Sequence, residues 1–325
     1  MLWGWEMAVA LRNIGWRVAV VPPQLELAAR QRIIRLERPD VILQIKCRHP
    51  LNHPKYFLGV PTVFVIDDAD YVDPDQLEKV VESCRASQIV VAANRATAQW
   101  CRAHSDHVEV LWVSHPKPQS RSIVRSSARQ PIVAWAHADP FSYTHECELM
   151  REVLIGLAAR TPYAFWLFGV RDRQWAEEYV APIKASGVDV RVLGYMRRYA
   201  DYLQSLHEVA VGLHPICLEN PYNQGKSFGK ILSYLAADVA VITPPVLDHV
   251  LVLKHRVNAM LPETPDQWID AACTLLTDQP FRQQLTDRAY EDFITHLSTQ
   301  VVAEKLDRLL RSVVRSDGHD KTKCA

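Results

Sequence analysis

The sequence predicts an α/β protein with two Rossmann-like domains. Short runs rich in Val and Ile alternate with longer amphipathic stretches, a pattern typical of β-α-β units around parallel sheets. A segment rich in Pro, Ser, Arg and Lys interrupts this alternation, and the pattern then restarts. The chain has 325 residues, more than one hydrophobic core usually serves, which again favours two domains.

The first half contains short apolar runs that predict strands, several of them apolar on successive residues, as expected when helices cover both faces of a sheet. The strands are expected at residues 17–21, 41–45, 62–66, 89–92 and 108–113. The helices are expected at residues 6–14, 25–37, 74–85 and 95–103. Because the chain opens on a helix, it shows no strand and Gly-rich turn of the kind that usually starts a doubly wound domain. Either the sequence begins late or this domain has a reduced sheet without its first strand.

The second half repeats the alternation. Strands are expected at residues 132–136, 164–168, 188–193, 209–213, 239–243 and 259–261. Helices are expected at residues 147–159, 175–185, 199–206, 227–237, 265–277 and 280–295. Apolar residues at helical spacing between Val301 and Val313 predict a last helix that packs one face against the body of the protein.

These patterns set the expected domain boundaries. The N-terminal domain covers residues 1–118, and a linker covers residues 119–130. The C-terminal domain covers residues 131–296 and is followed by the helix at 297–315. The polar residues 316–325 are expected to form a frayed tail.

Composition excludes several classes of function. Lys plus Arg and Asp plus Glu number 37 each, so no net field would attract nucleic acid. The seven cysteines show no pair at zinc or redox spacing, which indicates reduced thiols in a cytoplasmic protein. His49 and His53 have a spacing that a metal could use, but only Cys47 lies nearby, so no metal site is expected.

No apolar run reaches the roughly 18 residues of a membrane span. We therefore expect a soluble protein with at most peripheral contact to the inner face of a membrane.

The segment 214–243 carries the most information about chemistry. It reads as strand end, polar loop, helix and strand, and four residues form the buried stripe of the helix: Phe228, Ile231, Leu232 and Leu235. Lys226, Lys230 and Ser233 fall on a different helix face. Gly225 lets the backbone approach a ligand closely, and the helix start offers free N–H groups and the positive end of its dipole. With two lysines added, a nucleotide diphosphate bound there could be neutralised without a metal ion. The alternative is that these lysines only form a solvated helix face.

The order of residues in this segment favours the first interpretation. The sequence runs Gly212-Leu213-His214-Pro215, then Asn220 to Ser227 as NPYNQGKS, then Lys230, Tyr234, Ala236 and Val241. This order resembles the "GL.P" and "N.FN.GKS..K..EY.A.G.PV" patterns of family 4 glycosyltransferases of the GT-B fold, especially bacterial members that build surface polysaccharides. Trp166 to Gly169 and Val192 to Tyr195 resemble two further strand ends of that family. In the first half, Asp67-Asp68 and the later Asn94 resemble its "IDD" and "GN..LA" patterns.

The resemblance implies an α/β fold in which two Rossmann-like domains face a cleft, as in other GT-B proteins. The N-terminal domain would bind the acceptor and the C-terminal domain the nucleotide sugar. Lys226 or Lys230 would hold the diphosphate and Glu219 would stand near the donor sugar. Ser233 takes the place of the second acidic residue, which commonly holds the ribose, and Asp238 replaces a Gly. Five further donor contacts follow from the matched loop and strand ends: Asn223, Gly225, Ser227, Gly169 and Tyr195.

Two further groups of residues follow predicted strands, where open α/β sheets place their ligands. Asp67, Asp68 and Asp70 follow the strand at 62–66, and one of them, with Asp68 preferred, would orient an acceptor hydroxyl or act as base, with Asn94 on the same side. The alternative is that they are helix caps and solvated turns. Three carboxylates also suit a divalent cation, although GT-B enzymes generally need none.

His137 ends the first strand of the second domain, where the family often has a Gly-rich turn facing the donor phosphates. His137 and His145 are therefore candidate phosphate contacts, or ordinary loop histidines.

The leading hypothesis is a glycosyltransferase that moves a sugar from a nucleotide diphosphate donor to a glycan, lipid-linked or small-molecule acceptor, with retention of configuration, in glycan or polysaccharide biosynthesis. No cofactor beyond the donor and no metal ion is expected. A catalytically inactive GT-B-like binding or scaffolding protein is the alternative, motivated by Ser233 and Asp238. A sugar-nucleotide epimerase is a third interpretation.

Overall fold

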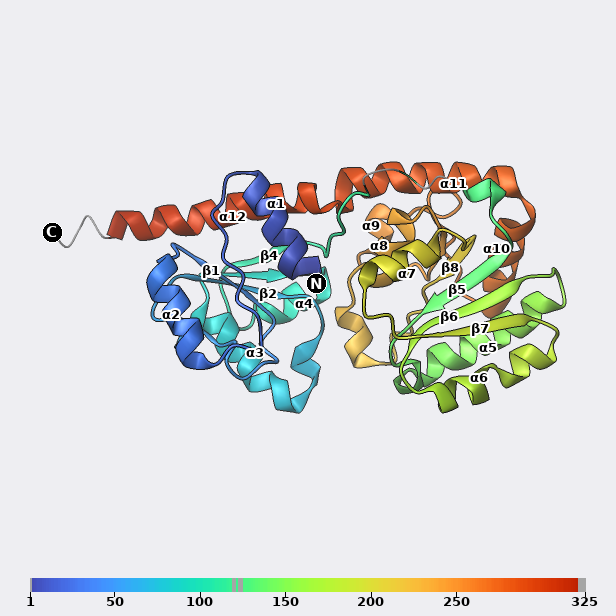
Figure 1. Cartoon of the computed structure of the whole chain (residues 1–325), viewed down its shortest axis with the longest axis horizontal. Coiled ribbons are helices and arrows are strands. Elements are labelled where there is room, and N and C mark those ends of the chain that lie inside the picture. Colours follow the sequence, from blue (N-terminus) through green and yellow to red (C-terminus); the bar gives the residue numbers. More distant parts are fainter. Residues whose placement is uncertain (1, 119–120, 122–124, 321–325) are drawn as a thin grey trace. The chain divides into compact units, whose positions relative to one another are not determined.

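The computed structural model describes residues 2–118, 121 and 125–320 (Figure 1). The chain forms two compact units. The first comprises Met1–Pro116, Pro221–Ser227 and Leu297–Ala325, and the second comprises Lys117–Asn220 and Phe228–His296. The loop 221–227 thus belongs to the first unit, although the chain on both sides of it belongs to the second. The boundaries expected from the sequence, including the linker at 119–130, stay predictions.

The first unit contains a four-stranded parallel sheet. Its strands are β1 (Ile42–Ile45), β2 (Thr62–Ile66), β3 (Ile89–Ala92) and β4 (Val108–Val110), and they lie side by side in chain order. Every residue of β2 and β3 is buried, as the apolar runs predicted. Among the described residues no strand precedes β1. The predicted strand at 17–21 is wrong, because these residues are exposed coil that pairs with no strand.

Helices surround this sheet. The chain opens with the π-helical turn η1 (Leu2–Glu6) and α1 (Met7–Asn13), then α2 (Leu27–Glu37), α3 (Pro74–Ala86) and α4 (Arg95–Cys101). The last helix, α12 (Thr299–Asp320), packs against α1. Trp16 Nε1 donates to Asp307 Oδ1 of α12 at 2.6 Å. The helix continues into the expected tail at 316–325, of which residues 321–325 lie outside the described part of the chain.

The second unit contains a five-stranded parallel sheet in the order β7-β6-β5-β8-β9. The strands are β5 (Ile132–Ala136), β6 (Ala164–Val170), β7 (Asp189–Gly194), β8 (Val211–Leu213) and β9 (Ala240–Ile242). The predicted strand at 259–261 is reduced to isolated bridges, Ile242 to Met260 and His255 to Ala259. The α/β class with parallel sheets is confirmed.

Helices cover both faces of the second sheet. One face packs against α5 (Thr144–Ala158), α6 (Arg173–Ala185) and α10 (Pro265–Thr277), which bury Met150, Ile183 and Trp268 with the strands. On the other face, α8 (Gly229–Ala236) packs Tyr234 onto Gly212, where any β-carbon would lie 2.7 Å from the Tyr234 ring. The remaining helices of this unit are α7 (Tyr199–Leu206), α9 (His249–Val252) and α11 (Gln279–Asp292).

The described part of the expected linker at 119–130 packs onto the second unit. It forms the turn η4 (Ser126–Ala128), whose Ser126 carbonyl accepts from Arg282 Nη2 at 2.8 Å. Arg282 is fully buried. Arg129 is also buried and donates to the carbonyls of Val209 and Ala237, both at 2.8 Å. Buried backbone acceptors are therefore satisfied by arginines at this end of the unit.

Asp238, which stands where the resembled family has Gly, has a structural explanation. Its φ of 63° lies in the left-handed region, which Asp tolerates better than most residues. Its carboxylate is 2% exposed and accepts from Arg121 Nη2 at 2.6 Å. The side chain thus joins the chain reversal between α8 and β9 to the segment that precedes β5.

We expect Asp238→Ala to lower the free energy of unfolding by about 2 kcal/mol, because a buried, charge-assisted hydrogen bond is lost. Asp287→Ala is the matched control, since Asp287 also lies 2.6 Å from Arg121 but is 36% exposed. It should cost at most about 1 kcal/mol. Urea unfolding followed by tryptophan fluorescence measures both. Equal losses would contradict the role given to Asp238.

Candidate functional site

Lys46 and two aspartates form a charge cluster at the carboxyl edge of the first sheet. Lys46 follows β1, and Asp67 and Asp68 follow β2, so parallel winding brings them to one edge. Lys46 Nζ lies 2.9 Å from Asp67 Oδ1 and 2.7 Å from Asp68 Oδ2. Lys226 Nζ approaches Asp68 Oδ1 at 3.6 Å from the loop 221–227. Lys46 was not predicted from the sequence, although it follows a strand just as Asp67 does.

The two neighbouring aspartates differ in basicity. Burial raises the pKa of Asp67, and the opposing charge of Lys46 does not cancel this effect. Burial also acts on Asp68, but there the charges of Lys226 and Lys46 outweigh it and lower the pKa. The pKa of Lys46 is raised because both carboxylates outweigh its own burial. Asp68 therefore stays ionised, while Asp67 is the better proton acceptor of the pair.

Asp70 lies in a second, adjoining part of this cluster. It is 2% exposed and pairs with Arg48, whose Nε donates to Asp70 Oδ2 at 2.9 Å. Arg48 also contacts Asp68 and donates to the hydroxyl of Tyr222. The Arg48 guanidinium thus links the end of β2 to the loop 221–227, a contact that no sequence pattern predicted.

The loop 221–227 is seated closely on the first unit. It begins with the helical turn η6 (Pro221–Gly225), in which Asn223 is buried. Asn94 Nδ2, at the start of α4, donates to the carbonyl of Gly225 at 2.6 Å. Ser227 Oγ accepts from the amide of Val113 at 3.4 Å. A β-carbon on Gly225 would lie only 2.4 Å from that of Ala69, so only glycine fits here.

The prediction that Lys226 and Lys230 lie on one face of a helix at 227–237 is wrong, because Lys226 is not in the helix. Helix α8 begins at Gly229, and Lys226 precedes it in the loop. The Lys226 ammonium lies over the ring of Tyr222, 4.4 Å from its centroid. The reason is a tertiary contact: packing of Gly225 on Ala69 fixes the loop backbone before the helix starts. The predicted stripe of Phe228, Ile231, Leu232 and Leu235 is buried as expected.

The second sheet changes its direction of winding between β5 and β8. Strands β6 and β7 lie on one side of β5, and β8 and β9 on the other. The crevice outside such a reversal, at the carboxyl ends of the strands, is where open α/β sheets bind ligands. His137 follows β5 and His214 follows β8, so both flank the reversal. The sheet of the first unit has no such reversal among its described strands.

The start of α8 lies beside this reversal. A β-carbon on Gly229 would lie 3.9 Å from His214 Nε2, so helix start and strand end are in contact. Gly229 and Lys230 are both exposed in the first turn, and the Lys230 ammonium lies 5.9 Å from the ring centroid of Tyr202. The helix start therefore presents exposed residues, the positive end of the helix dipole and a cation at the carboxyl edge of the sheet.

Four other residues predicted to contact the donor lie in or after the strands at this edge or in the helix that follows. Gly169 has a φ of 85°, and a β-carbon there would lie 3.4 Å from the carbonyl oxygen of His137. The imidazole of His137 packs 4.5 Å from the ring of Tyr143. Tyr195 follows β7, is 59% exposed, and lies under the guanidinium of Arg171. His145 lies in the first turn of α5.

Ser233 and Glu219 differ in their exposure to solvent. The Ser233 hydroxyl is buried and shares a hydrogen bond of 2.8 Å with Tyr199 of α7. Tyr199 was missed by sequence reasoning, because nothing in the pattern links α7 to α8. Glu219 is exposed in a turn after β8. The start of that loop is fixed by Glu146 of α5, which accepts from the Cys217 amide at 2.9 Å.

The predicted site residues thus fall into two groups. The first unit holds Asp67, Asp68, Asp70, Asn94, Asn223, Gly225, Lys226 and Ser227. The second unit holds His137, Gly169, Tyr195, Glu219, Lys230 and Ser233. The structure brings each group to the carboxyl edge of its own sheet. Their roles in binding and catalysis stay predictions.

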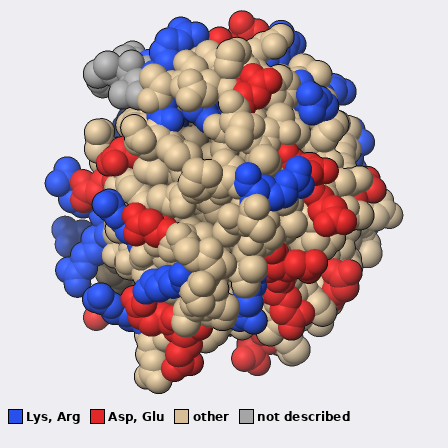
Figure 2. Space-filling model, turned by 90° about the vertical axis from the view of Figure 1, so that its right-hand side faces the viewer, with Lys and Arg blue, Asp and Glu red and all other residues tan. Residues whose placement is uncertain are grey.

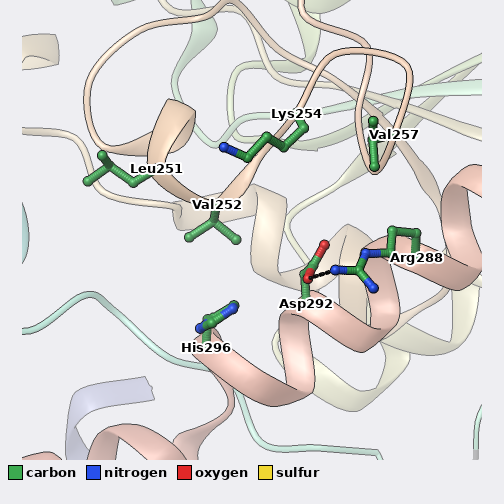
Figure 3. Close-up of a pocket in the computed structure, with 7 residues that line it drawn as sticks. All are labelled: Leu251, Val252, Lys254, Val257, Arg288, Asp292 and His296. Carbon is green, nitrogen blue, oxygen red and sulfur yellow. Dashed lines mark ion pairs between the residues drawn. The ribbon is translucent and has the colours of Figure 1, made fainter.

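A hollow of about 360 Å³ lies elsewhere on the second unit (Figure 3). Arg288 and Asp292 of α11 form an ion pair of 3.2 Å on one side of it, and Asn258 donates to Asp292 at 2.7 Å. Its seven lining residues come from the region around α9 and from the end of α11 and η7 (Phe293–Leu297), and none is at a strand end. We therefore do not assign the donor site to it.

Charge on the surface is mixed. On the face drawn in Figure 2, basic and acidic side chains lie among one another on the left, acidic side chains gather at the lower right, and further basic side chains lie at the upper right. Across the described residues, no group of three or more His, Cys, Asp or Glu side chains is arranged to hold a metal ion. None of the helices described is both long and apolar enough to cross a membrane.

No family model matches this sequence, and no curated protein matches it. Several solved structures match this chain. A sucrose-phosphate synthase from Thermosynechococcus elongatus matches with a TM-score of 0.70 at 12% identity, covering 96% of this chain and 92% of that chain. The Anabaena protein HepE, solved with UDP and glucose, matches with a TM-score of 0.65 at 15% identity, and the match covers 88% of this chain and 81% of HepE. The pneumococcal O-GlcNAc transferase GtfA, solved with UDP and GlcNAc, matches with a TM-score of 0.65 at 10% identity, and the match covers 89% of this chain and 60% of GtfA.

At these identities the likeness shows the fold alone. The fold is that of GT-B glycosyltransferases, as the motifs between Gly212 and Val241 implied. Membership of family 4 stays a prediction.

We expect Gly225→Ala to displace the loop 221–227 and to destabilise the protein by about 1 to 3 kcal/mol, since the added methyl group overlaps Ala69. Gly194→Ala is the control, because a β-carbon there meets nothing within 4 Å. Hydrogen exchange of the loop amides should accelerate only in the Gly225 variant. Unchanged exchange in both variants would refute the close seating of the loop.

Proposed function

We propose that this chain is a glycosyltransferase that transfers a sugar from a nucleotide diphosphate donor to an acceptor. One observation carries the proposal: α8 starts against His214, beside the reversal between β5 and β8. A reversal supplies the crevice, and the start of a helix with a lysine supplies the attraction for an anion.

In this proposal the donor diphosphate lies at Gly229 and Lys230. Breaking the bond between sugar and diphosphate leaves negative charge on the departing phosphate. The helix N–H groups and the Lys230 ammonium are fixed donors at that position, and such preorganised stabilisation is usually the largest catalytic contribution. His137 and His214, on the two strands that flank the reversal, are placed to add hydrogen bonds. This arrangement stabilises the leaving group without a metal ion.

The nucleoside end of the donor would lie further along α8. Ser233 is one turn beyond Lys230, and its hydroxyl is held by Tyr199. The two hydroxyls together offer a donor and an acceptor to a ribose, in place of the carboxylate expected from the resemblance. Glu219, on the exposed turn after β8, is the carboxylate proposed to contact the donor sugar.

We assign the acceptor to the carboxyl edge of the first sheet. Asp67 is the more basic of the neighbouring carboxylates, so we propose Asp67 rather than Asp68 as the group that accepts a proton from an acceptor hydroxyl. Asp68 instead holds Lys46 and Lys226 in place. A contact between Lys226 and the diphosphate remains a prediction from the sequence.

Other features of the proposal rest on similarity to solved structures and to the motifs of family 4. HepE and GtfA were solved with UDP, which makes a uridine diphosphate sugar the first donor to test. Retention of configuration, a glycan or lipid-linked acceptor, and a place in polysaccharide biosynthesis follow from the family 4 resemblance of the loop 220–227. Peripheral contact with a membrane stays a prediction.

A binding or scaffolding protein without activity is the second candidate. The observation in its favour is that Ser233, whose buried hydroxyl hydrogen-bonds to Tyr199, supplies no carboxylate at the position where the resembled family commonly binds the ribose. Such a protein would retain the fold and would not bind nucleotide diphosphates.

UDP should raise the melting temperature of the protein, because a ligand that binds only the native state stabilises it. Lys230→Ala should weaken UDP binding by about 2 kcal/mol, or about thirtyfold in Kd, through loss of a charge-assisted contact. Lys254→Ala is the control, since Lys254 carries the same charge but lines the hollow after α9 rather than the first turn of α8. Isothermal titration calorimetry measures both.

If UDP does not bind to the wild-type protein, the scaffolding function is favoured. UDP binding that Lys230→Ala and Lys254→Ala reduce equally would reject the proposed donor site.

A further inference from the structure

The hollow on the second unit has an aliphatic wall that is open to solvent (Figure 3). Leu251 and Val252 of α9 and Val257 of the following loop form this wall. Leu251 is 37% exposed and Val257 is 49% exposed. Large aliphatic side chains that gather around one hollow, rather than lying singly on a surface, indicate a contact with another molecule. None of these three residues belongs to the donor site proposed above.

One buried side chain holds the walls of the hollow together. Asn258 is 1% exposed, and its Oδ1 accepts from the Lys254 amide at 2.6 Å. Its Nδ2 donates to the Val252 carbonyl at 2.9 Å and to Asp292 Oδ2 at 2.7 Å. Asn258 thereby joins α9, the loop after it and the end of α11. A hollow whose walls are already fixed loses little conformational entropy when a ligand binds.

Among the described residues that line the hollow, Lys254 is the cation without a carboxylate partner. The lining carboxylate, Asp292, accepts from Asn258 and forms an ion pair of 3.2 Å with Arg288. Arg288 is also paired with Glu291, at 3.2 Å. Positive charge therefore remains in excess at Lys254, and an anion is the ligand that complements it.

An anionic lipid surface is the other partner that this loop suggests, because three basic residues follow one another at 254–256. Of these three, only Lys254 lines the hollow. His255 Nδ1 accepts from the Leu261 amide at 3.0 Å, and the Arg256 guanidinium lies 4.8 Å from the ring centroid of Phe281. Attraction to a charged membrane needs several cations that act together. A small ligand with one negative charge is therefore favoured.

We propose that the hollow binds a small monocarboxylate with an aliphatic body. The carboxylate pairs with the Lys254 ammonium, and His296, which also lines the hollow, offers a ring N–H. The aliphatic body lies against Leu251, Val252 and Val257. The inference does not depend on the proposed transferase activity, because it uses none of the residues assigned to the donor or the acceptor.

The size of the hollow limits the ligand. Its volume of about 360 Å³ is near the lower end of the range for small-molecule sites. At roughly 30 Å³ for each water-sized group, it admits about a dozen non-hydrogen atoms. A carboxylate with a chain of about eight carbons fits this space. A nucleotide diphosphate is too large and too highly charged for it.

The test is a titration of the full chain with octanoate, below the concentration at which octanoate forms micelles, followed by methyl NMR. We expect saturable shifts of the methyl signals of Leu251, Val252 and Val257. Lys254→Ala should weaken octanoate binding about tenfold, because a charge-assisted contact is lost. Lys254 is exposed, so its replacement leaves the fold intact.

Two controls separate charge from chain. Lys184→Ala removes the same charge from α6, where Lys184 pairs with Glu177, and should leave the octanoate affinity unchanged. Octanol has the same chain without the carboxylate, and it should bind to the wild-type protein more weakly than octanoate.

Absence of saturable shifts at the three wall residues overturns the inference. So does equal octanoate binding by the wild-type protein and Lys254→Ala, or octanol binding as tight as that of octanoate, because the charge at Lys254 would then contribute nothing. Phosphatidylserine vesicles that bind the wild-type protein but not Lys254→Ala, without any octanoate shifts, would overturn it in favour of a lipid surface.

Discussion

Parallel winding is the constraint on which this structure depends. When every strand of a sheet runs in the same direction, every strand ends at the same edge, and the residues that follow the strands are brought together however far apart they are in sequence. In the second unit, this places the residues after β5, β6, β7 and β8 along one edge, with a reversal between β5 and β8 of the kind at which open α/β sheets bind ligands. The start of α8 lies at the same edge, where we propose that it attracts the donor diphosphate.

The buried strands of both sheets were predictable because their physics is local. Strands β2, β3 and β5 have the predicted bounds, since four or five mostly apolar residues between polar turns favour a buried strand. Residues 17–21 have the same local pattern but no neighbouring strand to pair with. A strand is stable only with its partners, and the sequence pattern does not reveal whether a partner is present.

The candidate site was predictable in part. Strand-end residues such as Asp67 and His137 were found because the carboxyl edge is a rule of the fold. Lys226 was placed on the helix because its spacing to Lys230 suits a helix, whereas the packing of Gly225 on Ala69 delays the helix start to Gly229. Contacts of this kind join segments far apart in sequence, as between Asn94 and Gly225, and periodicity carries no sign of them.

The most direct test of the donor site is a crystal structure of this protein with UDP. The account predicts diphosphate density at the amides of Gly229 and Lys230, beside His214, with the ribose near Ser233 and Tyr199. Density for the diphosphate in the hollow beside Arg288, or at any place away from the carboxyl edge of the second sheet, would contradict it.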